Sequence, residues 1–200
     1  MPRPANPEVR RRLLDAGLAL VHARGFSASG VKDITDAAGV PKGSFYAYFP
    51  SKEAFAAAIL EHYWSDIETR LLPILTSGEA GGGTAQQRIT RFFHSLADDH
   101  EAGDFLLGCL VGNLSLELGG SSEAVRAQLV RILDRWDEAL TACLRSGQDG
   151  AGDVRADLDA AELAAMLIES WEGAALRGKV TRSRAPYERF ELSIVPALLR

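Results

Sequence analysis

Apolar residues recur every three or four positions along almost the whole chain, which is the spacing of amphipathic helices. No run alternates apolar and polar side chains for long enough to predict a β-strand. We therefore expect an all-α protein with about nine helices. Their predicted ranges are 8–24, 31–38, 42–48, 52–72, 85–101, 104–118, 123–146, 157–178 and 187–199.

Turn-forming residues separate these predicted helices. Gly25 and Gly39 follow the first two, where a left-handed backbone conformation readily ends a helix. Phe49 precedes a proline and so avoids the helical region, which ends the third helix. Pro73 is expected to kink or end the long fourth helix, and the glycine-rich run 77–84 predicts a surface loop.

Charge is distributed unevenly along the chain. The 200 residues carry a formal net charge of −5, whereas residues 1–52 hold eight Lys or Arg and only four Asp or Glu side chains. A basic segment on an acidic body is a hint of a polyanion partner, although the same asymmetry also arises by chance. With 46% apolar and 24% charged residues, the chain has enough apolar surface to fold without a metal or a disulfide.

The sequence predicts a protein that stays in the cytoplasm and has no membrane partner. No stretch approaches the roughly 18 consecutive apolar residues of a membrane span, and residues 1–17 lack the apolar core of a secretion signal. The two cysteines, Cys109 and Cys143, are expected to remain thiols in that reducing compartment.

Two short predicted helices, 31–38 and 42–48, are joined by a turn that contains Gly39 and follow a longer helix within the basic segment. This order is typical of a helix-turn-helix, whose second short helix enters the major groove of DNA. Such a helix needs small or polar residues at its start, to approach base edges, and side chains that hold phosphates. The residues that meet these needs are Lys42, Gly43, Ser44, Tyr46, Tyr48 and Lys52.

Structural roles are the alternative for several of these residues. Tyr46 and Tyr48 would also suit a small core, to which Phe45 and Phe49 are expected to contribute from an inner face. The two lysines would also suit an ordinary solvated surface. The convergence of glycine, serine, tyrosine and lysine on one exposed two-helix unit nevertheless favours DNA binding.

Residues 31–53, together with Gly25 and Phe26, closely resemble the DNA-binding domain of the TetR/AcrR family of transcriptional regulators. The resemblance implies a helix-turn-helix domain over residues 1–50 and a helical ligand-binding and dimerisation domain over residues 51–200. It also implies a homodimer that binds a palindromic operator in double-stranded DNA. Members of the family usually act as repressors that a small-molecule inducer releases from the operator.

The resemblance also implies DNA-contacting roles at matching positions, which here are Lys42, Ser44, Tyr46, Tyr48 and Lys52. One departure is Gly30, where many members carry a serine or threonine, so a phosphate contact from that hydroxyl is absent. Whether Ser29 replaces it is left open by the sequence. Ala47 has almost no reach, so the bases of the operator are not identified.

Two short motifs, 108–114 and 171–179, resemble the family branch that senses electrophiles and reactive carbonyl compounds, including regulators of N-ethylmaleimide reductase and of acrylate metabolism. This resemblance favours the hypothesis that Cys109 detects an electrophile. The alternative is a buried, inert thiol in a regulator that binds its inducer without a covalent bond. A reactive thiolate needs a nearby cation or a helix N-terminus, and Lys179 and Arg177 are the candidate cations.

Polar and aromatic residues are expected around Cys109. Asn113 and Glu117 follow it at i+4 and i+8, on the same face of the predicted helix 104–118. Pockets for small ligands combine a few such polar groups with aromatic walls, here represented by Trp171. The predicted sensing site therefore consists of Cys109, Asn113, Glu117, Trp171 and Lys179, while Cys143 is expected to be structural.

The last two predicted helices are rich in alanine and leucine, and the resemblance implies that they form the dimer interface as a four-helix bundle. An enzyme is the main alternative class, with Cys109 paired to a histidine or with the cluster 98–101 around a metal. No histidine has a second histidine at the i+4 spacing of a helical metal site, so we expect no catalytic residue, no metal and no cofactor. The operator sequence, the inducer, the regulated genes and the direction of regulation are not identified.

Overall fold

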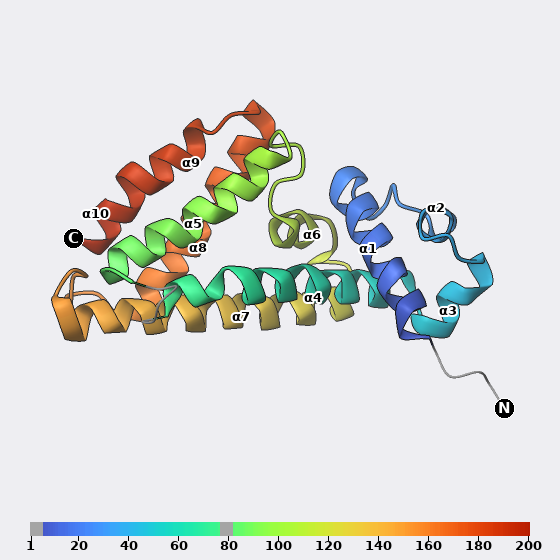
Figure 1. The fold of residues 1–200 in the computed structure, drawn as a ribbon, viewed down its shortest axis with the longest axis horizontal. Helices are drawn as coiled ribbons and strands as arrows, with labels where there is room; N and C mark the ends of the chain where they lie inside the picture. The colour runs from blue at the N-terminus through green and yellow to red at the C-terminus, as the bar shows by residue number, and fades with distance from the viewer. Residues whose placement is uncertain (1–5, 77–81) are drawn as a thin grey trace. The chain divides into compact units, whose positions relative to one another are not determined.

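The computed structural model describes residues 6–76 and 82–200, which fold into helices and turns without a β-strand (Figure 1). The expected all-α fold is therefore confirmed. Residues 77–81, part of the predicted glycine-rich loop, lie outside the described residues. The α-helices are α1 (Pro7–Arg24), α2 (Val31–Ala37), α3 (Phe45–Tyr48), α4 (Lys52–Arg70), α5 (Ala85–Ala102), α6 (Leu110–Leu118), α7 (Glu123–Ser146), α8 (Ala160–Thr181), α9 (Ala185–Arg189) and α10 (Val195–Leu199).

Four shorter helical segments continue or connect these helices. The 3₁₀ turns are η1 (Lys42–Ser44), directly before α3, and η2 (Leu72–Leu75), which contains Pro73 just after the end of α4. The π-helical turns are η3 (Gly147–Ala151) and η4 (Phe190–Ile194). Because η4 joins α9 and α10 into one continuous helix, the described parts of the chain contain nine α-helices, as expected.

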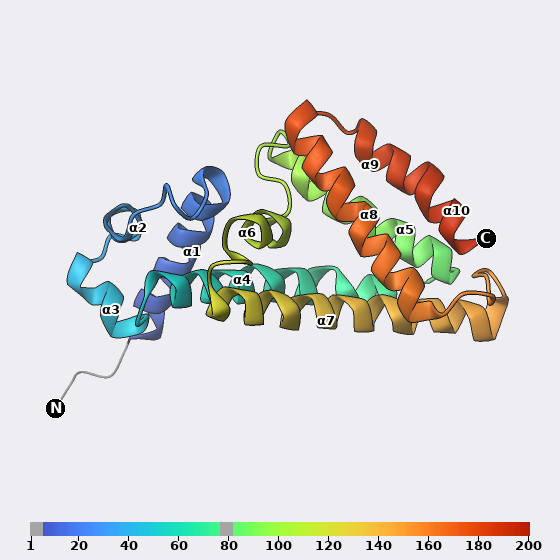
Figure 2. The ribbon, with the colours of Figure 1, turned by 180° about the vertical axis from the view of Figure 1, so that it is seen from behind.

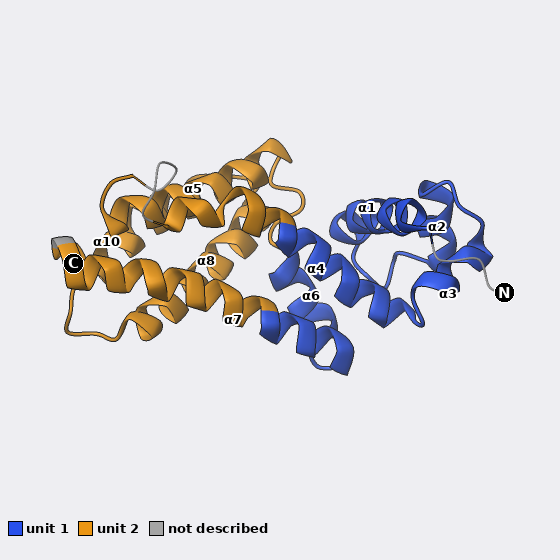
Figure 3. Ribbon diagram, turned by 60° about the horizontal axis from the view of Figure 1, so that its bottom comes forward, with its two compact units in different colours: residues 1–65, 110–131 blue, residues 66–109, 132–200 orange. Residues whose placement is uncertain are grey.

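The chain divides into two compact units (Figure 3). The first, the head unit, comprises Met1–Ser65 and Leu110–Arg131. It contains α1, α2, α3 and α6 together with the first parts of α4 and α7. The second, the body unit, comprises Asp66–Cys109 and Ile132–Arg200 and contains α5, α8, α9 and α10 with the remainder of α4 and α7.

Aromatic side chains form part of the core of the head unit. The ring centroid of Phe55 on α4 lies 5.0 Å from that of Phe45 and 4.7 Å from that of Phe49, and all three side chains are buried. The inner face predicted for Phe45 and Phe49 is thus confirmed. An added Cβ at Gly17 of α1 would lie only 2.3 Å from a ring carbon of Phe55. The absence of a side chain at Gly17 therefore lets α1 pack directly against the ring.

A second aromatic cluster fills the core of the body unit, where α8 lies beside α5 and the α9–α10 helix (Figure 2). The ring of Trp171 on α8 lies 5.2 Å from that of Phe93 on α5 and 5.5 Å from that of Phe190. An added Cβ at Gly178 would lie 2.2 Å from the ring of Tyr187, so α8 and α9 approach closely there. Large buried rings supply much of the apolar surface of such a core.

The prediction of one helix over 104–118 is wrong in its first half. The helix α6 begins only at Leu110. Phe105 and Gly108 have φ angles of 56° and 66°, which a right-handed helix does not accommodate. Cys109 therefore lies immediately before α6 instead of inside a helix.

Candidate functional site

The predicted recognition helix consists of η1 and α3, here called the recognition segment (Lys42–Tyr48), and it has a buried and an exposed face. Phe45 is completely buried, whereas 59% of the neighbouring Tyr46 is exposed. The two rings meet edge to face with their centroids 5.3 Å apart. A buried anchor next to an exposed tyrosine holds the outer face in place, which a binding site requires.

The recognition segment brings five of the six predicted DNA-binding residues together. Lys42, Gly43 and Tyr46 are exposed, while Ser44 and Tyr48 are half-buried. An added Cβ at Gly43 would meet no atom within 4 Å, so the backbone there is open to the close approach of a partner. A short, polar and open helix start is the geometry that contacts base edges.

Tyr48 also connects the recognition segment to the start of α1. Its hydroxyl oxygen accepts a hydrogen bond of 3.0 Å from the backbone N–H of Asn6. The side chain of Asn6 in turn caps α1 by accepting a hydrogen bond from the N–H of Glu8, also at 3.0 Å. Tyr48 therefore has a structural contact in addition to its predicted role.

Lys52, the sixth predicted residue, is engaged inside the head unit. Its Nζ donates a hydrogen bond of 2.6 Å to the carbonyl oxygen of Phe26 and lies 4.0 Å from the centroid of the Phe26 ring. These two contacts hold α4 to the connection between α1 and α2. The two residues are 26 positions apart, and no local pattern in the sequence indicated the contact.

The structure also answers the question that the sequence left open at Ser29. This side chain is buried, and its hydroxyl donates a hydrogen bond of 2.7 Å to the carbonyl oxygen of Gly25. Ser29 therefore presents no hydroxyl on the surface. The N–H of Gly30 donates to the carboxylate of Asp33 at 3.1 Å, which caps the start of α2.

Several cations of the basic segment are paired within the head unit. Arg11 lies 2.8 Å from Glu8 and 3.1 Å from Asp15, and Lys32 lies 2.6 Å from Asp36. The hydrogen bond with Asp36 raises the pKa of Lys32, and the hydrogen bond with Glu8 raises the pKa of Arg11. These pairs reduce the positive charge that the head unit presents outside the recognition segment.

The body unit holds three of the predicted sensing residues, namely Cys109, Trp171 and Lys179. Cys109 is 7% exposed, and its thiol donates a hydrogen bond to the carboxylate of Glu172. Burial raises the pKa of Glu172, although the hydrogen bond from Cys109 opposes this effect. A carboxylate whose pKa is raised is a suitable acceptor for the proton of a reacting thiol.

Lys179 packs against the residue that precedes Cys109. An added Cβ at Gly108 would lie 3.1 Å from Cδ of Lys179, in a backbone conformation that favours glycine. Burial, assisted by the positive charge of Arg182, lowers the pKa of Lys179. Arg177, the other candidate cation, is exposed.

Tyr187 and His100 add two polar groups to the aromatic surroundings of Trp171. The hydroxyl of Tyr187 lies 2.9 Å from Nδ1 of His100, and its ring centroid lies 5.3 Å from that of Trp171. Phe105 stacks on Tyr187 with the centroids 5.7 Å apart. Burial raises the pKa of Tyr187 well above its ordinary value, and the charges of Cys109 and Glu172 add to the effect.

Sequence reasoning did not single out Glu172, His100 or Tyr187 for this site. Glu172 had a detectable signal, since it is an acidic residue between apolar positions of α8 and adjoins Trp171. The pairing of His100 with Tyr187 had none, because the residues are 87 positions apart. Local periodicity carries no information on such a contact.

Asn113 and Glu117 belong to the head unit, whereas Cys109 belongs to the body unit. The shared helical face predicted for the three residues does not extend to Cys109, because α6 begins after it. The Glu117 carboxylate instead accepts hydrogen bonds from the backbone N–H groups of Phe26, at 2.8 Å, and Ser27, at 2.7 Å. Asn113 is half-buried.

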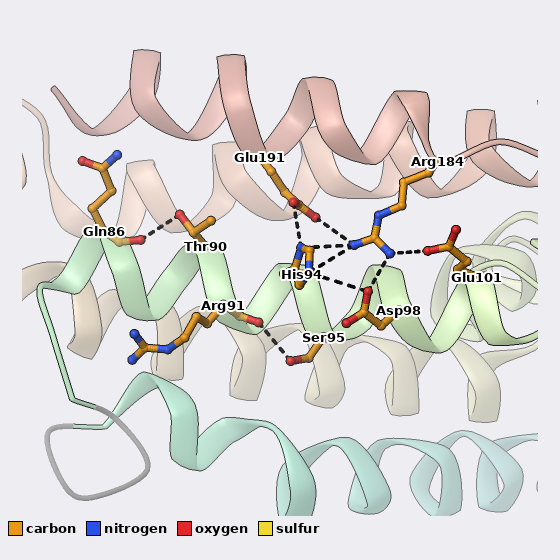
Figure 4. A network of polar contacts seen from close by, with 9 residues as sticks. All are labelled: Gln86, Thr90, Arg91, His94, Ser95, Asp98, Glu101, Arg184 and Glu191. Atoms are coloured by element: carbon orange, nitrogen blue, oxygen red, sulfur yellow. Dashed lines mark hydrogen bonds and ion pairs between the residues drawn. The ribbon is translucent and has the colours of Figure 1, made fainter.

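The acidic cluster 98–101, considered as a metal site in an enzyme, takes part in ion pairs of the body unit. Arg184 contacts the carboxylates of Asp98 and Glu101 and extends toward His94 and Glu191 (Figure 4). Within residues 6–76 and 82–200, no group of three or more His, Cys, Asp or Glu residues is placed to hold a metal ion. A search of the same residues finds no helix whose length and hydropathy would let it cross a membrane.

Comparisons with known proteins agree with this architecture. Residues 13–59 match the family model "Bacterial regulatory proteins, tetR family", and residues 85–194 match "Tetracyclin repressor-like, C-terminal domain". The chain is 38% identical over 195 residues to the HTH-type transcriptional repressor DhaR of Mycobacterium sp. (strain GP1). The aligned region covers 98% of this chain and 94% of that protein.

Two solved structures are similar over nearly the whole chain. The regulatory protein TetR from Rhodobacter sphaeroides matches with a TM-score of 0.85 and 33% identity over 96% of this chain and 99% of the other. The reduced form of NemR from E. coli matches with a TM-score of 0.82 and 30% identity over 96% and 97%. The helix-turn-helix, the helical body and these similarities lead to one conclusion: the chain belongs to the TetR family and is a DNA-binding transcriptional regulator.

Proposed function

We propose that the protein is a cytoplasmic, dimeric repressor that binds a palindromic operator and leaves it when a small electrophile reacts with Cys109. The observation that carries the DNA-binding part is the outer face of the recognition segment. There Lys42, Ser44 and Tyr46 surround the open backbone of Gly43. Donors on both sides of a glycine suit the approach of a helix start to base edges and phosphates.

Titration against duplex DNA from the region upstream of its own gene tests this function. We expect binding that weakens steeply with salt, because lysine contacts to phosphates release counterions. In a dimer the two recognition segments must enter major grooves about 34–36 Å apart, or a multiple of that. Deletion of one half-site should therefore remove most of the affinity. Binding that does not depend on salt concentration, or that is unchanged when one half-site is deleted, would argue for another function.

Exposed apolar side chains of the body unit support the proposed dimer. On α8, Leu176 is 55% and Val180 is 76% exposed, and Leu192 on η4 is 75% exposed. Leu176 and Val180 are four residues apart and so share one face of α8, and exposed apolar patches mark contacts between chains. We propose that α8 and the α9–α10 helix form this interface with the same helices of a second copy.

Introducing charge into this surface is expected to convert the dimer into a monomer. The double variant Val180→Asp, Leu192→Asp would bury unpaired carboxylates at the interface, which costs several kcal/mol. Sedimentation velocity measures the change. The matched control is Leu116→Asp, because Leu116 is 79% exposed but lies in the head unit. A double variant that sediments like the unaltered protein would place the interface elsewhere.

The surroundings of Cys109 support a covalent sensing reaction. In the proposed step, the sulfur forms a bond to the β-carbon of an α,β-unsaturated carbonyl compound and the carbon–carbon π bond breaks. The thiol proton passes to the Glu172 carboxylate, which accepts a hydrogen bond from it, and then to the α-carbon. The adduct is redox-neutral and adds bulk at Cys109, next to Glu172.

Cys109→Ser is expected to abolish the response to an electrophile while leaving operator affinity unchanged. With N-ethylmaleimide as the probe, the unaltered protein should lose about 10- to 100-fold in operator affinity, the range of ordinary allosteric coupling. Anisotropy titration measures the affinity and intact mass spectrometry measures the adduct. Cys143→Ser is the matched control. A Cys109→Ser protein that still responds would exclude covalent sensing at this residue.

A cavity in the body unit favours non-covalent inducer binding as the second candidate. It has a volume of about 550 Å³, within the usual range for small ligands. Its lining combines apolar side chains, including Leu72 and Leu75, with the polar groups of Cys143 and Ser146. A response that survives Cys109→Ser but disappears in Ala142→Trp, which fills this cavity, would favour this mode.

A further inference from the structure

A carboxylate from α6 binds two backbone N–H groups directly after α1. The Glu117 side chain accepts hydrogen bonds from Phe26, at 2.8 Å, and from Ser27, at 2.7 Å. Gly25, with a φ angle of +86°, turns the chain so that both N–H groups face the carboxylate. An added Cβ at Gly25 would lie 3.2 Å from Oε2 of Glu117, so the approach is close. Successive N–H groups around a left-handed residue form a concave anion site, here occupied by a side chain of the same protein.

Lys52 also contacts Phe26, at its carbonyl oxygen and its ring. Its Nζ donates to the carbonyl oxygen of Phe26 at 2.6 Å and lies over the ring at 4.0 Å. Phe26 is thus held at its N–H by Glu117, and at its C=O and ring by Lys52. We call these contacts the Phe26 clamp. All three residues belong to the head unit.

The charges of the Phe26 clamp are balanced locally. The C-terminal end of α1 carries a partial negative charge, so a carboxylate there needs compensation. Burial raises the pKa of Glu117, but hydrogen bonds from Ser27 and Phe26 and the charge of Lys52 outweigh it and leave the pKa below its ordinary value. The side chain is therefore ionised at neutral pH and accepts strong, charge-assisted hydrogen bonds.

The clamped residues belong to the connection that leads into the helix-turn-helix. Only residues 25–30 separate the end of α1 from the start of α2 at Val31. We infer that Glu117 is a positioning residue for operator binding, which keeps α2 and the recognition segment in the geometry that fits DNA by holding Phe26 and Ser27. This inference rests on the proposed DNA-binding function. In this inference, Glu117 itself does not contact DNA.

Glu117→Gln tests the inference because the amide keeps the shape but loses the charge and one acceptor oxygen. Removing a negative charge should, by simple electrostatics, strengthen DNA binding. Loss of the Phe26 clamp should instead weaken operator binding about tenfold, since hydrogen bonds to charged groups are among the strong ones. The direction of the change therefore separates positioning from charge.

Glu123→Gln is the matched control. Glu123 is an exposed acid of the head unit that pairs with Arg126, so its replacement removes the same charge without touching the Phe26 clamp. We expect this variant to bind the operator as well as the unaltered protein or slightly better.

Hydrogen exchange of the Phe26 and Ser27 amides, measured without DNA, provides the second readout. We expect exchange at these amides to be faster in Glu117→Gln than in the unaltered protein or in Glu123→Gln, while amides within α1 keep their protection. Unchanged exchange, or operator binding of Glu117→Gln as tight as that of Glu123→Gln, would overturn the inference. If instead neither the unaltered protein nor Glu123→Gln binds DNA, the proposed function fails, and the exchange result still decides whether the clamp exists.

Discussion

Operator affinity is expected to fall about 100-fold when Lys42 and Tyr46 are both replaced by alanine, which corresponds to about 3 kcal/mol. Lys42→Ala removes the proposed charged contact with a phosphate, and Tyr46→Ala removes a hydroxyl and a ring from the exposed face of the recognition segment. Anisotropy titrations at several salt concentrations measure the effect. The slope of log affinity against log salt concentration should become shallower by about one in Lys42→Ala, because the proposed phosphate contact is lost.

The same double variant should leave the free energy of unfolding within about 0.5 kcal/mol, since neither side chain is buried. Urea titration provides that measurement. Arg126→Ala is the matched control for charge, because Arg126 is an exposed cation of the head unit on α7 and pairs with Glu123. Equal losses of affinity in Arg126→Ala and Lys42→Ala would mean that overall charge, and not the recognition segment, governs binding.

Unlike the Lys42 and Tyr46 double variant, Phe45→Ala is expected to change stability: it should destabilise the protein by about 3–5 kcal/mol. Phe45 is fully buried, and its ring lies 5.6 Å from that of Phe49 and 5.0 Å from that of Phe55. Removing the ring leaves a cavity between α3 and α4 that these large side chains cannot readily fill. The variant should therefore unfold at a much lower urea concentration than the unaltered protein.

Ala47→Ser serves as the control for Phe45→Ala, because Ala47 is exposed on the same short helix. Its stability should stay within about 0.5 kcal/mol of the unaltered protein. Tyr46→Ala, one residue from Phe45, should likewise change affinity far more than stability. A stable Phe45→Ala protein, or an equally unstable Tyr46→Ala protein, would contradict the assignment of an inner and an outer face to the recognition segment.

The recognition segment was the most predictable part of the candidate site. Its residues are neighbours in the chain, so their order alone places Phe45 and Phe49 on one face and Tyr46 on another. The sensing site was less predictable. Trp171 and Glu172 are adjacent, yet the contact of Glu172 with Cys109 depends on how α8 packs within the body unit.

By itself, the sequence determined the helical class, most helix boundaries and the orientation of the recognition segment. These features follow from the 3.6-residue period of apolar positions and from the local backbone preferences of glycine and proline. Only the tertiary structure decided that Lys52 and Glu117 both contact Phe26, from which they are separated by 26 and 91 residues in the chain. It also decided that Cys109 precedes α6. Contacts between distant residues arise from the packing of whole helix faces, and a short window of sequence does not specify which faces meet.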